Sequence, residues 1–231
     1  MKKYGLYLEF IFICCIFILP PLFASPAGNA DLDFSFSWFS AISFSAALYV
    51  FFKYEYSEKE HKGFNFFNFL LSAGRVFLYF GLLVLVHILI TAIEFYLKPE
   101  LPNQTIELNF LKIFLITVNF IARAFYEENI YRLYLPSALH CFIEKFYRSF
   151  FLKQSEGFKV RFFLMADSVI EIFCIAVFAL SHRYLGFLSV INAFVCGAIL
   201  RYCVKKSNTV LTASCSHALY NITVFFSNFL L

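Results

Sequence analysis

The sequence predicts an all-α protein, a polytopic transmembrane helical bundle of about seven to eight spans. Of its 231 residues, 61% are hydrophobic and only 15% are charged, whereas soluble domains contain about 25% charged residues. The mean hydropathy is +0.74. Spans of ~20 residues with short loops would use the whole length, which leaves no room for a soluble domain.

The lipid bilayer is therefore an expected partner. The net charge of +4 is small, and no basic run suggests nucleic acid, which we exclude as a partner. The small size and the Lys2-Lys3 start suit a bacterial protein. We expect a multi-pass integral protein of the bacterial plasma (inner) membrane.

Residues 1–107 are expected to form N-terminal transmembrane helices. The apolar run Tyr4–Ala24 has the charged start and small-residue end of a signal peptide, but its length favours a retained first span. A second span is predicted from about Phe34 to Phe52, before the polar loop Lys53–Gly63. A third is predicted from Arg75 to about Tyr96.

Residues 108–231 are expected to form a second group of transmembrane helices. Pro136 should interrupt the helical pattern after the first of its spans. The segment Ser137–Leu152 fits either a span or an interfacial amphipathic helix. The predicted spans of this half are Leu108–Phe125, Phe162–Leu180, Tyr184–Leu200 and Thr209–Leu231.

The cysteines carry no recognisable site. There are seven, mostly inside apolar runs, with no CxxC pair and no spacing typical of zinc ligands. We interpret them as small packing residues and expect no disulfide framework.

Two adjacent carboxylates mark the most unusual point of the chain. Glu127 and Glu128 follow the apolar run Phe110–Phe125, and Arg132 comes four residues after Glu128. Charges at the end of a membrane-length apolar segment are costly and indicate a functional site. Glu128 and Arg132 are i,i+4 on a helix and can pair, which leaves Glu127 free for chemistry.

Two further motifs follow in the C-terminal half. Phe178 and His182 form an FxxxH pattern at a predicted helix end, and His217 and Asn221 form an HxxxN pattern inside the last span. The latter spacing puts both side chains on one helix face, about 6 Å apart along the axis. In hydrocarbon such polar groups must face the bundle interior.

The ordered set EExxxR, FxxxH and HxxxN resembles the CPBP family of intramembrane proteases. These are the CAAX proteases and Abi (bacteriocin-processing and immunity) proteins, with the type II CAAX prenyl endopeptidases as eukaryotic relatives. The resemblance covers roughly Leu108–Leu231 and implies that residues 108–231 are the catalytic transmembrane core. The stretch between Arg132 and Phe178 is longer than is typical of the family.

The resemblance implies a hydrolase: a glutamate-dependent CAAX-type intramembrane endopeptidase. Glu127 and His182 would activate water, while His217 and Asn221 would stabilise the oxyanion. Glu128 and Arg132 would be structural support, and Phe178 would pack. The substrate would be a membrane-associated peptide or protein, lipidated or unlipidated.

The family mechanism needs no cofactor or metal. The less favoured alternative is a zinc ion held by Glu127, His182 and His217. Two other functions stay open. One is a non-catalytic immunity or peptide-binding protein of the same family. The other is a transporter with a proton path through Glu94, Asp167 and Glu171.

Overall fold

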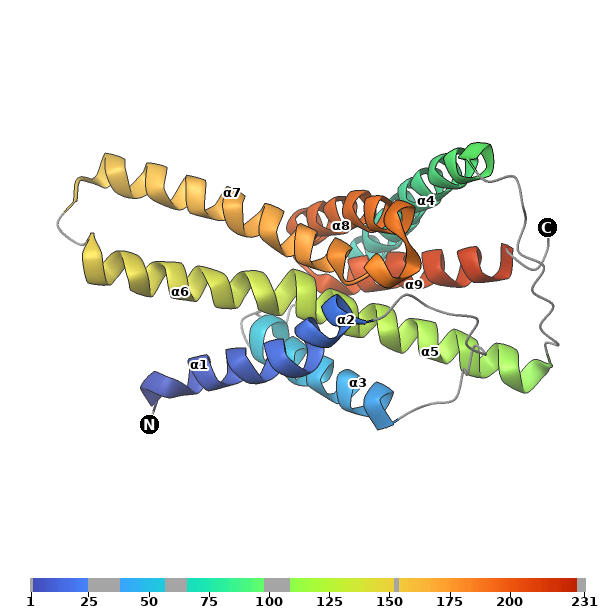
Figure 1. Cartoon of the computed structure of the whole chain (residues 1–231), viewed down its shortest axis with the longest axis horizontal. Coiled ribbons are helices and arrows are strands. Elements are labelled where there is room, and N and C mark those ends of the chain that lie inside the picture. Colours follow the sequence, from blue (N-terminus) through green and yellow to red (C-terminus); the bar gives the residue numbers. More distant parts are fainter. Residues whose placement is uncertain (1, 25–37, 57–65, 98–108, 152–153, 228–231) are drawn as a thin grey trace.

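A computed structural model describes residues 2–24, 38–56, 66–97, 109–151 and 154–227 (Figure 1). Every regular element in these ranges is a helix, which confirms the all-α class. Four stretches within them are long and apolar enough to cross a membrane, and they are Gly5–Phe23, Leu70–Leu97, Glu156–Leu180 and Phe187–Ser207. The protein is a polytopic helical membrane protein.

The N-terminal helices cover the described parts of the predicted spans and extend beyond two of these spans, since residues 53–56 are π-helical where a loop is predicted and the third helix begins at Phe66 rather than Arg75. The first is one continuous helix made of α1 (Lys2–Ile13), the π-helical turn η1 (Cys14–Ile18) and α2 (Leu19–Phe23). The others are α3 (Trp38–Phe51) with the π-helical turn η2 (Phe52–Tyr56), and α4 (Phe66–Leu97). The rest of the predicted loop after Tyr56, and the predicted boundary between residues 107 and 108, lie outside the described residues.

The expected break at Pro136 is wrong. Helix α5 (Phe110–Glu128) passes through the π-helical turn η3 (Asn129–Tyr134) directly into α6 (Leu135–Phe150). Pro136 stands in the first turn of α6. A proline is tolerated in the first turn of an α-helix, and here the π turn before it lets the chain continue as a helix.

The C-terminal elements are three long helices. They are α7 (Glu156–Leu180), α8 (Phe187–Ser207) and α9 (Val210–Ser227), with the short 3₁₀ turn η4 (Arg183–Leu185) after α7. The Ser155 side chain accepts the Phe158 N–H and starts α7. Gly186, at φ +105°, adopts a left-handed conformation that suits glycine and lets α8 turn back.

The long helix formed by α5, η3 and α6 divides the molecule (Figure 1). On one side lie α1, α2 and α3, and on the other lie α4, α7, α8 and α9. Helix α9 packs against both α4 and α5, and α6 runs antiparallel beside α7. The π turn thus lies at the centre of the bundle, where the larger buried apolar cluster also includes Ile130, Tyr131 and Tyr134.

Candidate active site

The acidic pair lies at the junction of α5 with the π turn. Glu128 is fully buried, and its Oε2 is 3.4 Å from Nε of Arg132, which is also buried. The ion pair predicted from the i,i+4 spacing is therefore present. π turns inside helices occur frequently at functional sites.

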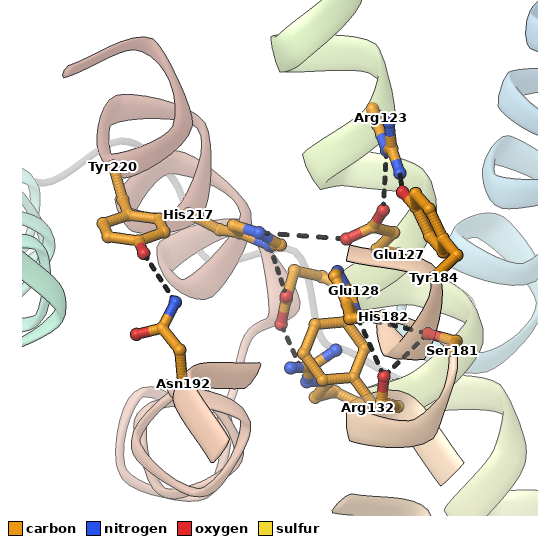
Figure 2. A network of polar contacts seen from close by, with 11 residues as sticks. Arg123, Glu127, Glu128, Arg132, Ser181, His182, Tyr184, Asn192, His217 and Tyr220 are labelled. Atoms are coloured by element: carbon orange, nitrogen blue, oxygen red, sulfur yellow. Dashed lines mark hydrogen bonds and ion pairs between the residues drawn. The ribbon is translucent and has the colours of Figure 1, made fainter. Parts of the chain in front are cut away.

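His217 connects the two glutamates (Figure 2). Its Nδ1 lies 2.8 Å from Oε1 of Glu128, and its Nε2 lies 3.8 Å from Oε2 of Glu127. A carboxylate can only accept a hydrogen bond, so Nδ1 carries a proton. The contact with Glu128 fixes the imidazole with Nε2 directed at Glu127.

His182 lies in the turn after α7, between two of the candidate spans. Its Nδ1 is 3.0 Å from the Phe178 carbonyl, which is an acceptor, so Nδ1–H donates and Nε2 is unprotonated in the neutral ring. Burial lowers the pKa of His182, although the Glu127 carboxylate acts in the opposite direction. At neutral pH, His182 is thus a proton acceptor.

Phe178 packs, as predicted, and it organises the charged groups around it. Its ring centroid is 3.6 Å from the guanidinium carbon of Arg132, and its ring also contacts His182 and His217. Gly197 in α8 permits this stack, because a Cβ there would lie 3.2 Å from the Phe178 ring. The aromatic face stabilises a buried cation.

Arg123 was missed by the sequence analysis. Its Nε donates to Oε1 of Glu127 at 2.9 Å, and its Nη2 donates to the Tyr184 hydroxyl at 3.1 Å (Figure 2). The sequence does contain a pattern that predicts this pair, because Arg123 precedes Glu127 by four residues and the two can meet on one helix face. The free carboxylate inferred for Glu127 is thus a paired one, held in its charged form by a half-exposed guanidinium.

A cavity of about 290 Å³ opens beside these groups. Its lining includes Glu127 from α5 and His182 from the turn after α7, and both face the same space. The walls are supplied by α2, α3, α5, the π turn and the turn after α7, through Pro21, Ser40, Ser43, Asn119, Ala122, Arg123, Tyr126, Tyr131, Ser181 and Tyr184. His217 is not among the lining residues and reaches Glu127 from the side of α9.

Asn221 is the predicted site residue for which the structure shows no polar partner among the described residues. It is half-buried on α9. The nearby polar contact on α9 joins Tyr220 to Asn192, whose Nδ2 donates to the tyrosine hydroxyl at 2.9 Å. The motifs containing Glu127, His182 and His217 do meet, as the family resemblance required.

The arrangement does not suit a metal ion. Within the described ranges, no group of three or more His, Cys, Asp and Glu side chains is placed to hold one. The Arg123 guanidinium already occupies Oε1 of Glu127 and would repel a second cation there. The residues named for a zinc ion do not fit it as they are placed.

The groups of the predicted proton path are paired with different helices or exposed. Glu171 pairs with Arg201 and Lys205, and Asp167 lies 3.1 Å from His140. Glu94 is exposed on α4. Asp167 thus faces α6, whereas Glu171 faces α8.

Fold and site together define a helical membrane protein with a buried glutamate–histidine centre. Residues 109–223, about half of the chain, match the family model described as type II CAAX prenyl endopeptidase Rce1-like. The chain belongs to this family of CAAX-type membrane endopeptidases. None of the curated proteins and none of the solved structures compared matches the chain.

Proposed function

We propose that the protein is an intramembrane endopeptidase that hydrolyses a peptide bond of a membrane-associated peptide or protein. One observation carries this proposal: Glu127 on α5 and His182 in the turn after α7 face the same cavity. A carboxylate and a neutral imidazole in one cavity are suitable groups to take a proton from water and pass it on. The family match supports a peptidase.

In the proposed reaction, Glu127 takes a proton from a water molecule held between it and His182. The resulting hydroxide adds to the carbonyl carbon of the peptide and creates a tetrahedral oxyanion. The C–N bond then breaks, and the proton held by Glu127 or His182 moves to the departing amine. No oxidant, reductant or metal is consumed or required in this sequence.

The oxyanion needs hydrogen-bond donors. The family resemblance assigns this role to His217 and Asn221. His217 can donate through Nε2 only as an imidazolium, because Nδ1 already donates to Glu128. In this proposal Glu128 and Arg132 are supporting residues that hold His217 and the π turn in place.

The test is a cleavage assay in detergent or liposomes with a panel of lipidated and unlipidated peptides. It compares the wild type with Glu127→Ala and His217→Ala, each with and without a zinc chelator. Glu144→Ala, which removes a half-exposed carboxylate on α6, is the matched control. We expect both site variants to lose cleavage by about two orders of magnitude or more, with no effect of chelator.

Two results would count against the proposal. Loss of wild-type cleavage on chelation would replace the metal-free mechanism with a metal-dependent one. If no peptide were cleaved, while both site variants kept the cellular phenotype of the wild type, the peptide-binding alternative would take over.

A further inference from the structure

The carbonyl of Arg132 lies in the π turn of the long helix, four residues before Pro136. In a regular α-helix this carbonyl would accept the N–H four residues later, which is position 136. Pro136 has no N–H. A carbonyl buried without a donor would be costly.

A side chain from another helix donates to this carbonyl. Nη1 of Arg201, on α8, lies 2.6 Å from the Arg132 carbonyl oxygen. Arg201 is itself held by α7, since its Nε and Nη2 donate to the two oxygens of Glu171 at 2.5 and 2.7 Å. Both side chains are 15% exposed, so solvent screens this bidentate pair only partly.

We propose that Arg201, oriented by Glu171, is a positioning residue for the active site, acting through the main chain of Arg132. The inference rests on the proposed function. Arg132 pairs with Glu128, which holds His217, which in turn is directed at Glu127. Fixing the Arg132 carbonyl therefore fixes the first member of a chain of contacts that ends at the proposed base.

Lys205 offers a matched control on the same helix. Its Nζ lies 2.9 Å from Oε1 of Glu171, so its removal takes one positive charge from the same carboxylate. No contact between Lys205 and the Arg132 carbonyl occurs among the described residues. Replacing Lys205 removes only an ion pair with Glu171. Replacing Arg201 removes an ion pair with Glu171 and also the hydrogen bond to the Arg132 carbonyl.

The first arm of the experiment does not depend on activity. Amide hydrogen exchange is measured by mass spectrometry in nanodiscs for the wild type, Arg201→Gln and Lys205→Gln. We expect Arg201→Gln to speed exchange about tenfold in peptides covering residues 129–138, with no change in residues 110–122. Equal exchange in the two variants would overturn the proposed link.

The second arm measures kcat and KM with a peptide that the wild type cleaves in the panel. Arg201→Gln should lower kcat about tenfold and leave KM unchanged. The lost hydrogen bond positions the reacting groups and does not change the residues that line the substrate cavity. Arg201→Lys should lower kcat less, since a single ammonium cannot hold Glu171 bidentately and reach Arg132 as well. A rise in KM alone, or full kcat in both Arg201 variants, would overturn the positioning role.

The two arms separate the possible failures. If the wild type cleaves no peptide, the proposed function fails, while hydrogen exchange still decides whether Arg201 anchors the π turn. If Arg201→Gln does not fold, Arg201→Lys decides. If Arg201→Lys showed the amide exchange rates of the wild type in residues 129–138 together with the kcat of the wild type, the proposal would be refuted.

Discussion

Replacing Glu128 with glutamine tests the buried ion pair, and the chain contains its own control. Glu128 and Arg132 are an i,i+4 pair whose side chains are 0% and 3% exposed. Glu144 and Arg148 form the same i,i+4 pair on α6, but at 51% and 70% exposure. The two pairs differ in burial and in the contacts that the buried pair adds, since Glu128 also accepts from His217 and Arg132 also stacks on Phe178.

Removing one partner of a buried pair leaves an uncompensated charge and costs about 3–5 kcal/mol. Glutamine can still accept a hydrogen bond, so we expect Glu128→Gln to lower the free energy of unfolding by about 3 kcal/mol. Glu144→Gln should cost less than about 0.5 kcal/mol, because an exposed pair is solvated and screened.

The assay is SDS-induced unfolding in mixed micelles, followed by circular dichroism. Adding Arg132→Met to Glu128→Gln should recover part of the loss, since an apolar side chain leaves no buried charge. Equal unfolding free energies for Glu128→Gln and Glu144→Gln would refute the argument that burial makes this pair important.

Three further predictions concern the surroundings of the pair. Gly197→Val should destabilise the fold by about 1–3 kcal/mol in the same unfolding assay, because even a Cβ would press on the Phe178 ring. Gly81→Ala should be neutral or stabilising, because a Cβ there meets nothing within 4 Å. The rate of cleavage should fall as the pH drops and His182 takes up a proton, with a midpoint below the ordinary histidine value of about 6.5, since its pKa is lowered. Arg123→Lys should reduce kcat about tenfold, because lysine cannot hold Glu127 and Tyr184 at once.

Each of these has a contradicting result. Equal stability for the Gly197 and Gly81 variants would mean that α8 is not closely packed against the site. An acid limb that persists unchanged in His182→Gln would assign the titration to another group. Full activity in Arg123→Lys would show that Arg123 does not position Glu127. Arg148→Lys, which changes an exposed arginine on α6, is the control.

The helices were largely predictable from the sequence, because apolar runs of membrane length have few alternative structures. Pro136 was the exception. A proline normally ends or kinks a helix, and only the neighbouring π turn and the donor from Arg201 allow the helix to continue. That donor comes from a distant segment, which local spacing does not reveal.

The site was predictable where its groups are separated by one helical step. Glu128 and Arg132 pair as the i,i+4 spacing indicates, and the motifs with His182 and His217 join them. Arg123 shares the same spacing to Glu127 but belongs to no motif, so it was overlooked. The contact of His217 with Glu128 depends on how α9 packs on α5, and sequence spacing contains no information about that packing.

The central claim is that peptide hydrolysis takes place in the cavity beside Glu127. The most direct measurement compares the cleavage rates of Ala122→Phe and Ile121→Phe. Ala122 lines the cavity, whereas Ile121 is its neighbour on α5 and is 50% exposed. Filling the cavity should lower cleavage about 100-fold without altering any ion pair, while Ile121→Phe should keep the wild-type rate. Wild-type cleavage by a folded Ala122→Phe protein would show that the reaction occurs elsewhere.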